Sequence, residues 1–244
     1  MKNNYLSVLF IAILLLFSSS CQEEENVFLK EKHLKNEFVN PYDYVGYHHN
    51  RVLEFIYNEA VKNGENPNKE TVIDNIVNYA VSNLEEYAEN GINKETLKAN
   101  LLIMDTVSMF LHPISTVPYL DRLEYVLLDK YVDTTSFDAL HSIITNIEFL
   151  VYSDENLSGE EKELVLGTAS VIHHSLRFWE ENLTKYKLLK NSRKRNWPIW
   201  DKICHIAKED SRGYRLGRDH WLVGSVCNGI SYSAERSWNA IDDK

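Results

Sequence analysis

The sequence predicts an all-α fold, a single bundle-like domain of about eight helices that follows a cleaved signal peptide. From Tyr42 onward, apolar residues recur at intervals of three and four positions, which is the spacing of one face of a helix. No segment alternates apolar and polar residues convincingly, and five Pro and nine Gly are too few for a many-turned β architecture. We therefore expect residues 41–244 to form one helical domain.

Apolar stripes and local start and stop signals place the individual helices. The tetrapeptide Asn-Lys-Glu-Thr occurs at 68–71 and again at 93–96, where Asn is a good N-cap and Glu suits the helix dipole. Ser158 and Glu161 form a capping-box pattern, and Gly64 ends the first helix. The expected helices span about 42–63, 69–89, 94–112, 118–132, 136–152, 158–186, a segment opened by Pro198, and 217–239.

The first 20 residues have the three parts of a secretory signal. Lys2 supplies a positive charge, Leu6–Phe17 is apolar apart from Ser7, and serines end the segment. The apolar run is shorter than the roughly 20 residues that a membrane-spanning helix needs. An uncleaved anchor helix is the alternative, but its flank would be basic, whereas the flank here is acidic. We expect residues 1–20 to be removed.

Cys21 directly follows three serines at the end of the apolar run. Over residues 1–26 this arrangement resembles the lipobox of bacterial lipoproteins, although Ser18 stands where that family most often has leucine. The resemblance implies that the Cys21 sulfur receives a diacylglycerol and that the new N-terminus is acylated after cleavage. Two or more acyl chains anchor a protein stably, because each buried methylene contributes about 0.8 kcal/mol.

An acidic segment follows the cysteine. Gln22–Glu25 resembles the export tag of surface-exposed lipoproteins in some diderm bacteria, and a solvated spacer between domain and membrane is the other interpretation. Residues 21–40 are polar with little periodicity, so we interpret them as a lipidated tether. The expected location is the outer membrane, lipid-anchored, with exposure at the cell surface left open.

The charge balance excludes one class of function. Without residues 1–20 the chain has 36 acidic and 25 basic residues. Such a domain gains little from approaching phosphate backbones, so nucleic-acid binding is not expected as its main function. The expected partners are the membrane, through the lipid, and a protein, peptide or glycan ligand.

Two cysteines remain after the lipidated one, Cys204 and Cys227. A compartment outside the cytoplasm permits a disulfide between them, closing a loop of about 23 residues and contributing roughly 3 kcal/mol. Two buried thiols that act as small apolar groups are the other interpretation. The sequence leaves both open.

Histidines occur in two adjacent pairs, His48-His49 and His173-His174. His49 and His173 fall on or beside the apolar faces of their helices, so packing of the two helices would bring their imidazoles close together. A metal site would need three or four converging ligands, and the chain lacks His-Glu-x-x-His, Glu-x-x-His and Cys-x-x-Cys. Histidines hydrogen-bonded within the core are the favoured interpretation.

Small residues recur at four-residue spacing in the last predicted helix, at Ser225, Gly229 and Ser233. Glycine inside a helix costs up to about 1 kcal/mol, so a compensating close contact is expected. Such spacing lets helix backbones approach closely. A central helix packed tightly by its neighbours is the first interpretation, and a homodimer seam is the second.

These features predict an outer-membrane-anchored lipoprotein with a helical binding or structural interaction domain of unknown ligand. No catalytic residue is assigned, and the only group attached is the lipid on Cys21. One alternative is a metal-dependent hydrolase that uses His49 and His173. Another is a protective, immunity-type lipoprotein that intercepts a toxic peptide.

Overall fold

The computed structural model describes residues 38–64, 67–84, 93–103, 116–128, 137–189, 199–218 and 226–241. Within these residues there are eight α-helices and no strand, which confirms the predicted all-α class. The helices are α2 (Asp43–Asn63), α3 (Lys69–Asn83), α5 (Lys94–Ile103), α6 (Val117–Leu128), α7 (Phe137–Ser153), α8 (Gly159–Leu189), α9 (Ile199–Arg218) and α10 (Val226–Ala240).

The chain divides into two units, Met1–Val39 and Asn40–Lys244, and all eight helices belong to the second. The predicted signal peptide at 1–20, Cys21 and nearly all of the predicted tether lie outside the described residues, so the interpretations placed on them stay predictions. Among the helices that are described, none is both long and apolar enough to cross a membrane.

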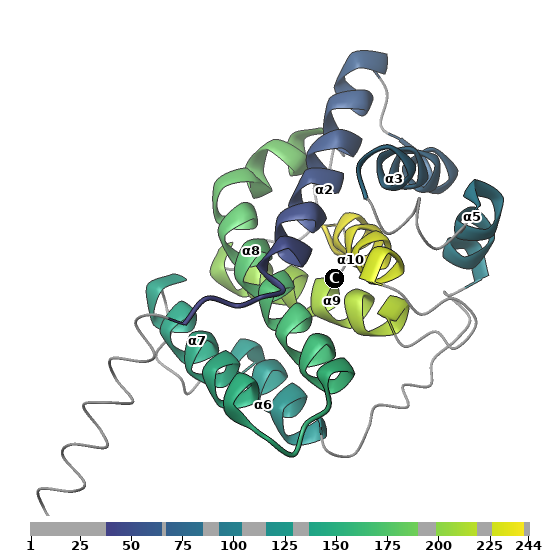
Figure 1. Cartoon of the computed structure of the whole chain (residues 1–244). Helices are drawn as coiled ribbons and strands as arrows, with labels where there is room; N and C mark the ends of the chain where they lie inside the picture. Colours follow the sequence, from purple (N-terminus) through teal and green to yellow (C-terminus); the bar gives the residue numbers. More distant parts are fainter. Residues whose placement is uncertain are drawn as a thin grey trace, which may run out of the picture. The chain divides into compact units, whose positions relative to one another are not determined.

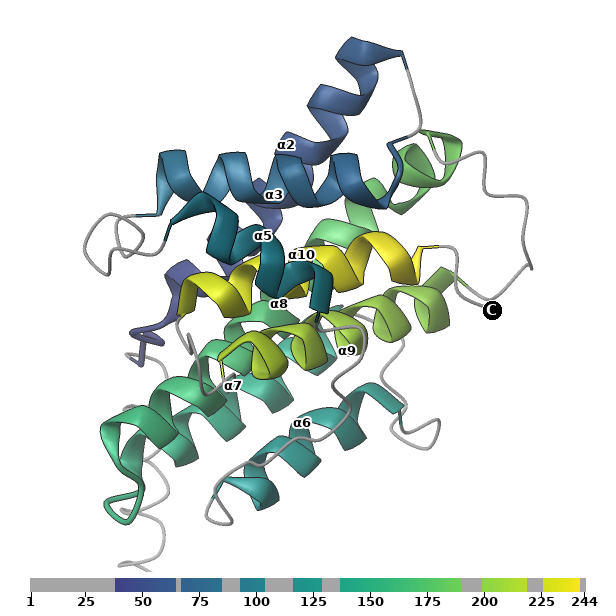
Figure 2. The same cartoon turned by 90° about the vertical axis from the view of Figure 1, so that its right-hand side faces the viewer.

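Helix α10 lies at the centre of the second unit, where it contacts α9, α2, α3 and α5 (Figure 1). In the turned view, α3 and α5 lie on one side of α10, while α9 and α8 lie on the other and α6 and α7 follow beyond them (Figure 2). The longest helix, α8, packs against α2, α7 and α9. Helix α8 therefore contacts both α2 and α7.

The predicted capping signals act as expected. The side chains of Asn68 and Asn93 accept hydrogen bonds from backbone amides three residues later, at 2.9 and 2.7 Å. The Ser158 amide donates to the Glu161 carboxylate at 2.8 Å, and the Glu161 amide donates to the Ser158 hydroxyl at 3.2 Å, which is a complete capping box. Gly64 ends α2 in the left-handed conformation, with φ of 68°.

Two predicted helix boundaries differ from the structure. Helix α3 ends at Asn83, before the predicted end near 89, because Leu84 is buried in an extended conformation with φ of −104° and ψ of 113°. The last helix was predicted to begin at about 217, but residues 217 and 218 belong to α9, and α10 is described from Val226. Helix α9 tolerates an internal glycine because Gly213 lies directly against the backbone of Tyr232 and Ser233 in α10.

Candidate functional site

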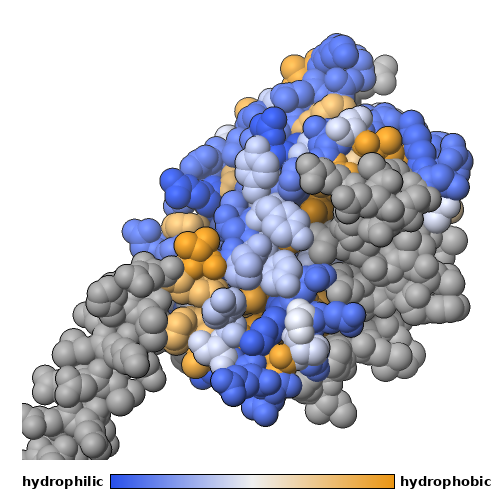
Figure 3. All heavy atoms as spheres, viewed as in Figure 1, coloured by the Kyte–Doolittle hydropathy of each residue, from blue (hydrophilic) through white to orange (hydrophobic). Residues whose placement is uncertain are grey.

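A cleft of about 370 Å³ lies between α2, α7 and α8. On the face of the molecule seen in Figure 3, hydrophilic residues dominate the described surface and apolar residues form only small patches. The lining of the cleft is chemically mixed and contains carboxylates, arginines, histidines, amides and aromatic rings. Its lining residues are Asp43, Tyr47, Asn50, Arg51, Glu54, Phe137, His141, His173, His174, Arg177, Phe178, Glu181 and Asn182.

Helical periodicity explains why these residues share one cleft. On α2, the lining residues follow one another at intervals of four, three, one and three positions, which keeps them on one stripe of the helix. On α8, lining residues recur as neighbouring pairs every four positions, from the His173-His174 pair onward. Helix α7 contributes Phe137 and His141, which are one turn apart. Each helix therefore gives the cleft one stripe of lining residues.

A close contact between α2 and α8 fixes the position of the cleft. The Gly46 amide donates to the Ser170 hydroxyl at 3.0 Å, and this hydroxyl donates to the Asp43 carbonyl oxygen at 3.0 Å. A side chain at position 46 would overlap the Ser170 carbonyl oxygen and hydroxyl and the His174 ring. Glycine at position 46 therefore permits the first turn of α2 to lie directly on α8.

His174 forms the first of two imidazole–carboxylate pairs at the cleft. Its Nε2 donates to Oδ1 of Asp43 at 3.0 Å, and this hydrogen bond lowers the pKa of the Asp43 carboxyl below its ordinary value. The backbone carbonyl of His174 accepts a hydrogen bond of 3.0 Å from Nδ2 of Asn50. That bond fixes the orientation of the amide, and the Oδ1 atom of Asn50 is buried without a hydrogen-bond partner in the described structure.

His173 forms the second pair, with Glu148 of α7. Nε2 of His173 donates to the His141 carbonyl at 3.3 Å, so Nδ1 presents its lone pair toward Oε1 of Glu148, 3.7 Å away. Burial lowers the pKa of His173 to about 3 and raises the pKa of Glu148 to about 7. An uncharged imidazole therefore faces a carboxyl that holds a proton up to about neutral pH.

Aromatic rings and ion pairs complete the walls. The rings of Phe137 and His141 stack with centroids 5.5 Å apart, and those of His141 and His173 lie 4.5 Å apart. The Arg177 guanidinium lies 5.8 Å from the Phe137 ring and 3.7 Å from the Glu181 carboxylate. Such a surface offers ring faces together with donors and acceptors that are already held in place. It is suited to binding a polar ligand.

The structure separates His49 from the cleft. His49 is 0% exposed in the core, where the Ser233 hydroxyl lies 2.8 Å from Nδ1 and the Asp210 carboxylate lies 3.4 Å from Nε2. Asp210 also accepts hydrogen bonds from Ser175 and Ser237. His49 is thus a hydrogen-bonded core histidine, as the favoured interpretation expects.

The metal-site hypothesis gains no support from this arrangement. The nitrogens of His49 face α9 and α10, whereas those of His173 face α7. Within the part of the chain that the structure describes, no three His, Cys, Asp or Glu side chains lie close enough together to hold a metal ion.

The cysteine and small-residue predictions are only partly covered by the structure. Cys204 is buried, and burial raises the pKa of its thiol to about 12, but the side chain of Cys227 lies outside the described residues. The pairing of the two cysteines stays a prediction. Gly229 packs against the Tyr214 ring of α9 and Ser233 binds His49, so both make contacts within the chain; Ser225 lies outside the described residues.

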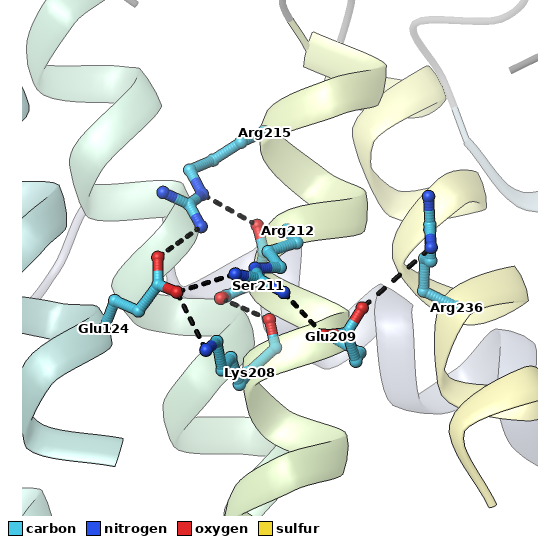
Figure 4. Close-up of polar contacts among 7 residues, drawn as sticks. All are labelled: Glu124, Lys208, Glu209, Ser211, Arg212, Arg215 and Arg236. Carbon is cyan, nitrogen blue, oxygen red and sulfur yellow. Dashed lines mark hydrogen bonds and ion pairs between the residues drawn. The ribbon is translucent and has the colours of Figure 1, made fainter. Parts of the chain in front are cut away.

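A separate cluster of charges joins α6 to α9 (Figure 4). Oε1 of Glu124 lies 2.9 Å from both Lys208 and Arg212, and its Oε2 lies 3.5 Å from Arg215. Arg212 also pairs with Glu209 at 2.9 Å. The three cations follow one another at intervals of four and three positions along α9, so a single carboxylate of α6 can bind all three. We assign this cluster a structural role.

Sequence reasoning missed most of the cleft. A signal was present in the predicted helix 42–63, because Asp43, Tyr47 and Asn50 form a stripe beside the apolar face.

Comparison of the chain with protein-family models, with curated proteins and with solved structures finds no match.

Proposed function

We propose that this protein is an outer-membrane lipoprotein that is anchored through Cys21 and binds a ligand in the cleft between α2, α7 and α8. The observation that carries the binding role is the cleft itself, with aromatic rings and polar groups from three helices. The anchor rests on the leader, the position of Cys21 and the acidic segment after it. The tether would leave the helical domain in water, beside the membrane.

The polar groups of the cleft are paired with one another, which favours ligand binding over catalysis as the function. Asp43 is bound to His174, and the arginines at the cleft are paired with carboxylates one turn along the same helices. Groups held in this way present fixed donors and acceptors, which is what recognition of a ligand requires. His173 is shielded by burial and by its contacts with His141 and Glu148.

The anchor is tested by lipid labelling. Cells that express the wild-type chain or Cys21→Ala are fed radiolabelled palmitate, and the protein is recovered from separated inner and outer membranes. We expect label in the wild type, found with the outer membrane, and none in Cys21→Ala, which keeps its leader. A labelled Cys21→Ala protein, or an unlabelled wild type released from the cell, would show that Cys21 does not carry a lipid anchor.

The cleft is tested by ligand screening with a matched pair of variants. Tyr47 lines the cleft and is 53% exposed, while Tyr152 is 52% exposed on α7 and does not line it. Defined pools of neutral oligosaccharides, synthetic peptides and phospholipid vesicles are screened by the shift in melting temperature of the purified protein. A pool whose shift is lost in Tyr47→Ala and kept in Tyr152→Ala supports the cleft. Shifts that are equal in both variants place binding elsewhere and contradict it.

A further inference from the structure

We infer that the ligand class of this cleft is a neutral saccharide, an inference that rests on the proposed binding function. Four features of the cleft point to this class: the charge state of its lining, its rings, an unpaired acceptor and its size. The pairing of the charged groups is the feature that favours a saccharide over the charged peptides and lipid headgroups that an extracytoplasmic binding domain could also meet.

The two arginines of the lining are each paired with a carboxylate, and a third carboxylate, Asp43, is hydrogen-bonded to an imidazole. Arg51 is bound to Glu54 and Arg177 to Glu181, within one helical turn in each case, and Asp43 is bound to His174. A ligand with a net charge would meet both signs at each Arg–Glu pair, so it would gain less there than at an unpaired charge. A neutral ligand with hydroxyl groups can add hydrogen bonds to the free edges of the same groups without separating them.

Aromatic rings supply the apolar part of the surface. The Tyr47 ring is half exposed, and Phe137 and His141 form a stacked pair at 5.5 Å on the opposite helix. The faces of aromatic rings carry negative partial charge, so they attract the C–H groups of a pyranose, which carry positive partial charge. The half-exposed Tyr47 ring is the one best suited to this contact, because the Phe137 and His141 rings turn a face toward each other and Arg177 lies 5.8 Å from the Phe137 ring.

Asn50 adds a hydrogen-bond acceptor that has no partner in the described structure. Its Nδ2 is committed to the His174 carbonyl, which leaves Oδ1 as a buried acceptor with no partner in the described structure. A buried acceptor without a hydrogen bond is unfavourable, so a ligand hydroxyl that reaches this oxygen would gain affinity from it. Asn182 provides a second amide at the same cleft.

The size of the cleft limits the length of the saccharide. A volume of about 370 Å³ lies near the lower end of the range for small-molecule sites, which is roughly 300–1,000 Å³. A short saccharide, or the end of a longer glycan chain, fits that volume. A folded protein partner would need a much larger contact area.

The test uses saturation-transfer NMR and calorimetry with maltose, cellobiose, lactose, mannobiose and diacetylchitobiose as probes, on the full chain in detergent. We expect at least one neutral sugar to bind, Tyr47→Ala to weaken it about tenfold, and Tyr47→Phe to stay within about twofold, because the ring carries the contact. Tyr152→Ala should bind like the wild type. Sugar binding that is insensitive to Tyr47→Ala would overturn the inference.

Two further outcomes separate this inference from the proposed function. If none of the sugars binds, but a charged peptide or a vesicle binds with the same dependence on Tyr47, the cleft is a binding site and the saccharide assignment is wrong. If no sugar, peptide or vesicle shows any dependence on Tyr47, the proposed cleft function fails together with this inference. Circular dichroism of each variant excludes loss of the fold as the cause.

Discussion

Asn40 and Glu148, which are 108 positions apart, are joined by a hydrogen bond of 2.7 Å from Nδ2 of Asn40 to Oε1 of Glu148. Nδ2 of Asn40 also donates to the Leu166 carbonyl at 2.9 Å. The segment that precedes α2 is thereby tied to α7 and α8 together. Because Glu148 also faces His173, this contact links the start of the helical unit to the buried side of the cleft.

Glu148→Gln should change the pH dependence of stability. Burial raises the pKa of Glu148 from 4.5 to about 7, so between these values the folded state binds a proton that the unfolded state lacks. This carboxyl therefore destabilises the wild type progressively as the pH rises from 4.5 to 7. Gln is neutral and keeps an acceptor for Asn40. We expect its free energy of unfolding, relative to the wild type, to increase from pH 5 to pH 8, by up to about 3 kcal/mol.

Urea unfolding at several pH values measures this change, with Glu155→Gln as the control. Glu155 is exposed in the turn between α7 and α8, so its variant should follow the wild type at every pH. A Glu148→Gln variant whose difference from the wild type does not vary between pH 5 and pH 8 would show that Glu148 has an ordinary pKa.

His173→Gln should act in the opposite direction. Burial lowers the pKa of His173 from 6.5 to about 3, so between these values the unfolded state binds a proton that the folded state lacks. The wild-type protein therefore loses stability as the pH falls from 6.5 toward 3. We expect His173→Gln to lose less stability than the wild type between pH 6.5 and pH 4, measured by thermal unfolding. An NMR titration in which the His173 ring takes up its proton near pH 6.5 would contradict this expectation.

Local signals in the sequence predicted the fold well. Caps such as Asn68 and the Ser158–Glu161 box act within four residues, so the sequence alone specifies them. The cleft depends on pairs that no local pattern marks. Asp43 and His174 are 131 positions apart, and the partners of His173 are Glu148 and His141 on a different helix, α7. Choosing among such partners requires the packing of the helices, which periodicity does not supply.

Gly46→Ala should destabilise the helical unit. A Cβ atom at position 46 would overlap the Ser170 backbone, which cannot move away as a flexible side chain can. Alanine gains up to about 1 kcal/mol in helix propensity, but overpacking costs about 1–3 kcal/mol, so we expect a net loss of stability. Gly159→Ala is the control, because a Cβ atom added there, at the start of α8, would meet no other atom within 4 Å. Equal stabilities of the two variants in urea would mean that α2 and α8 do not meet at Gly46.

Asp210→Ala should destabilise the core strongly. Asp210 is fully buried and accepts hydrogen bonds from Ser175, Ser237 and the Trp179 indole, the last at 3.3 Å, as well as facing His49. Alanine leaves these donors unsatisfied in the core, so we expect the free energy of unfolding to fall by roughly 3–5 kcal/mol. Asp121→Ala, at an exposed position on α6, should change it by less than about 0.5 kcal/mol. Unchanged stability of Asp210→Ala in urea unfolding would show that the network is not formed.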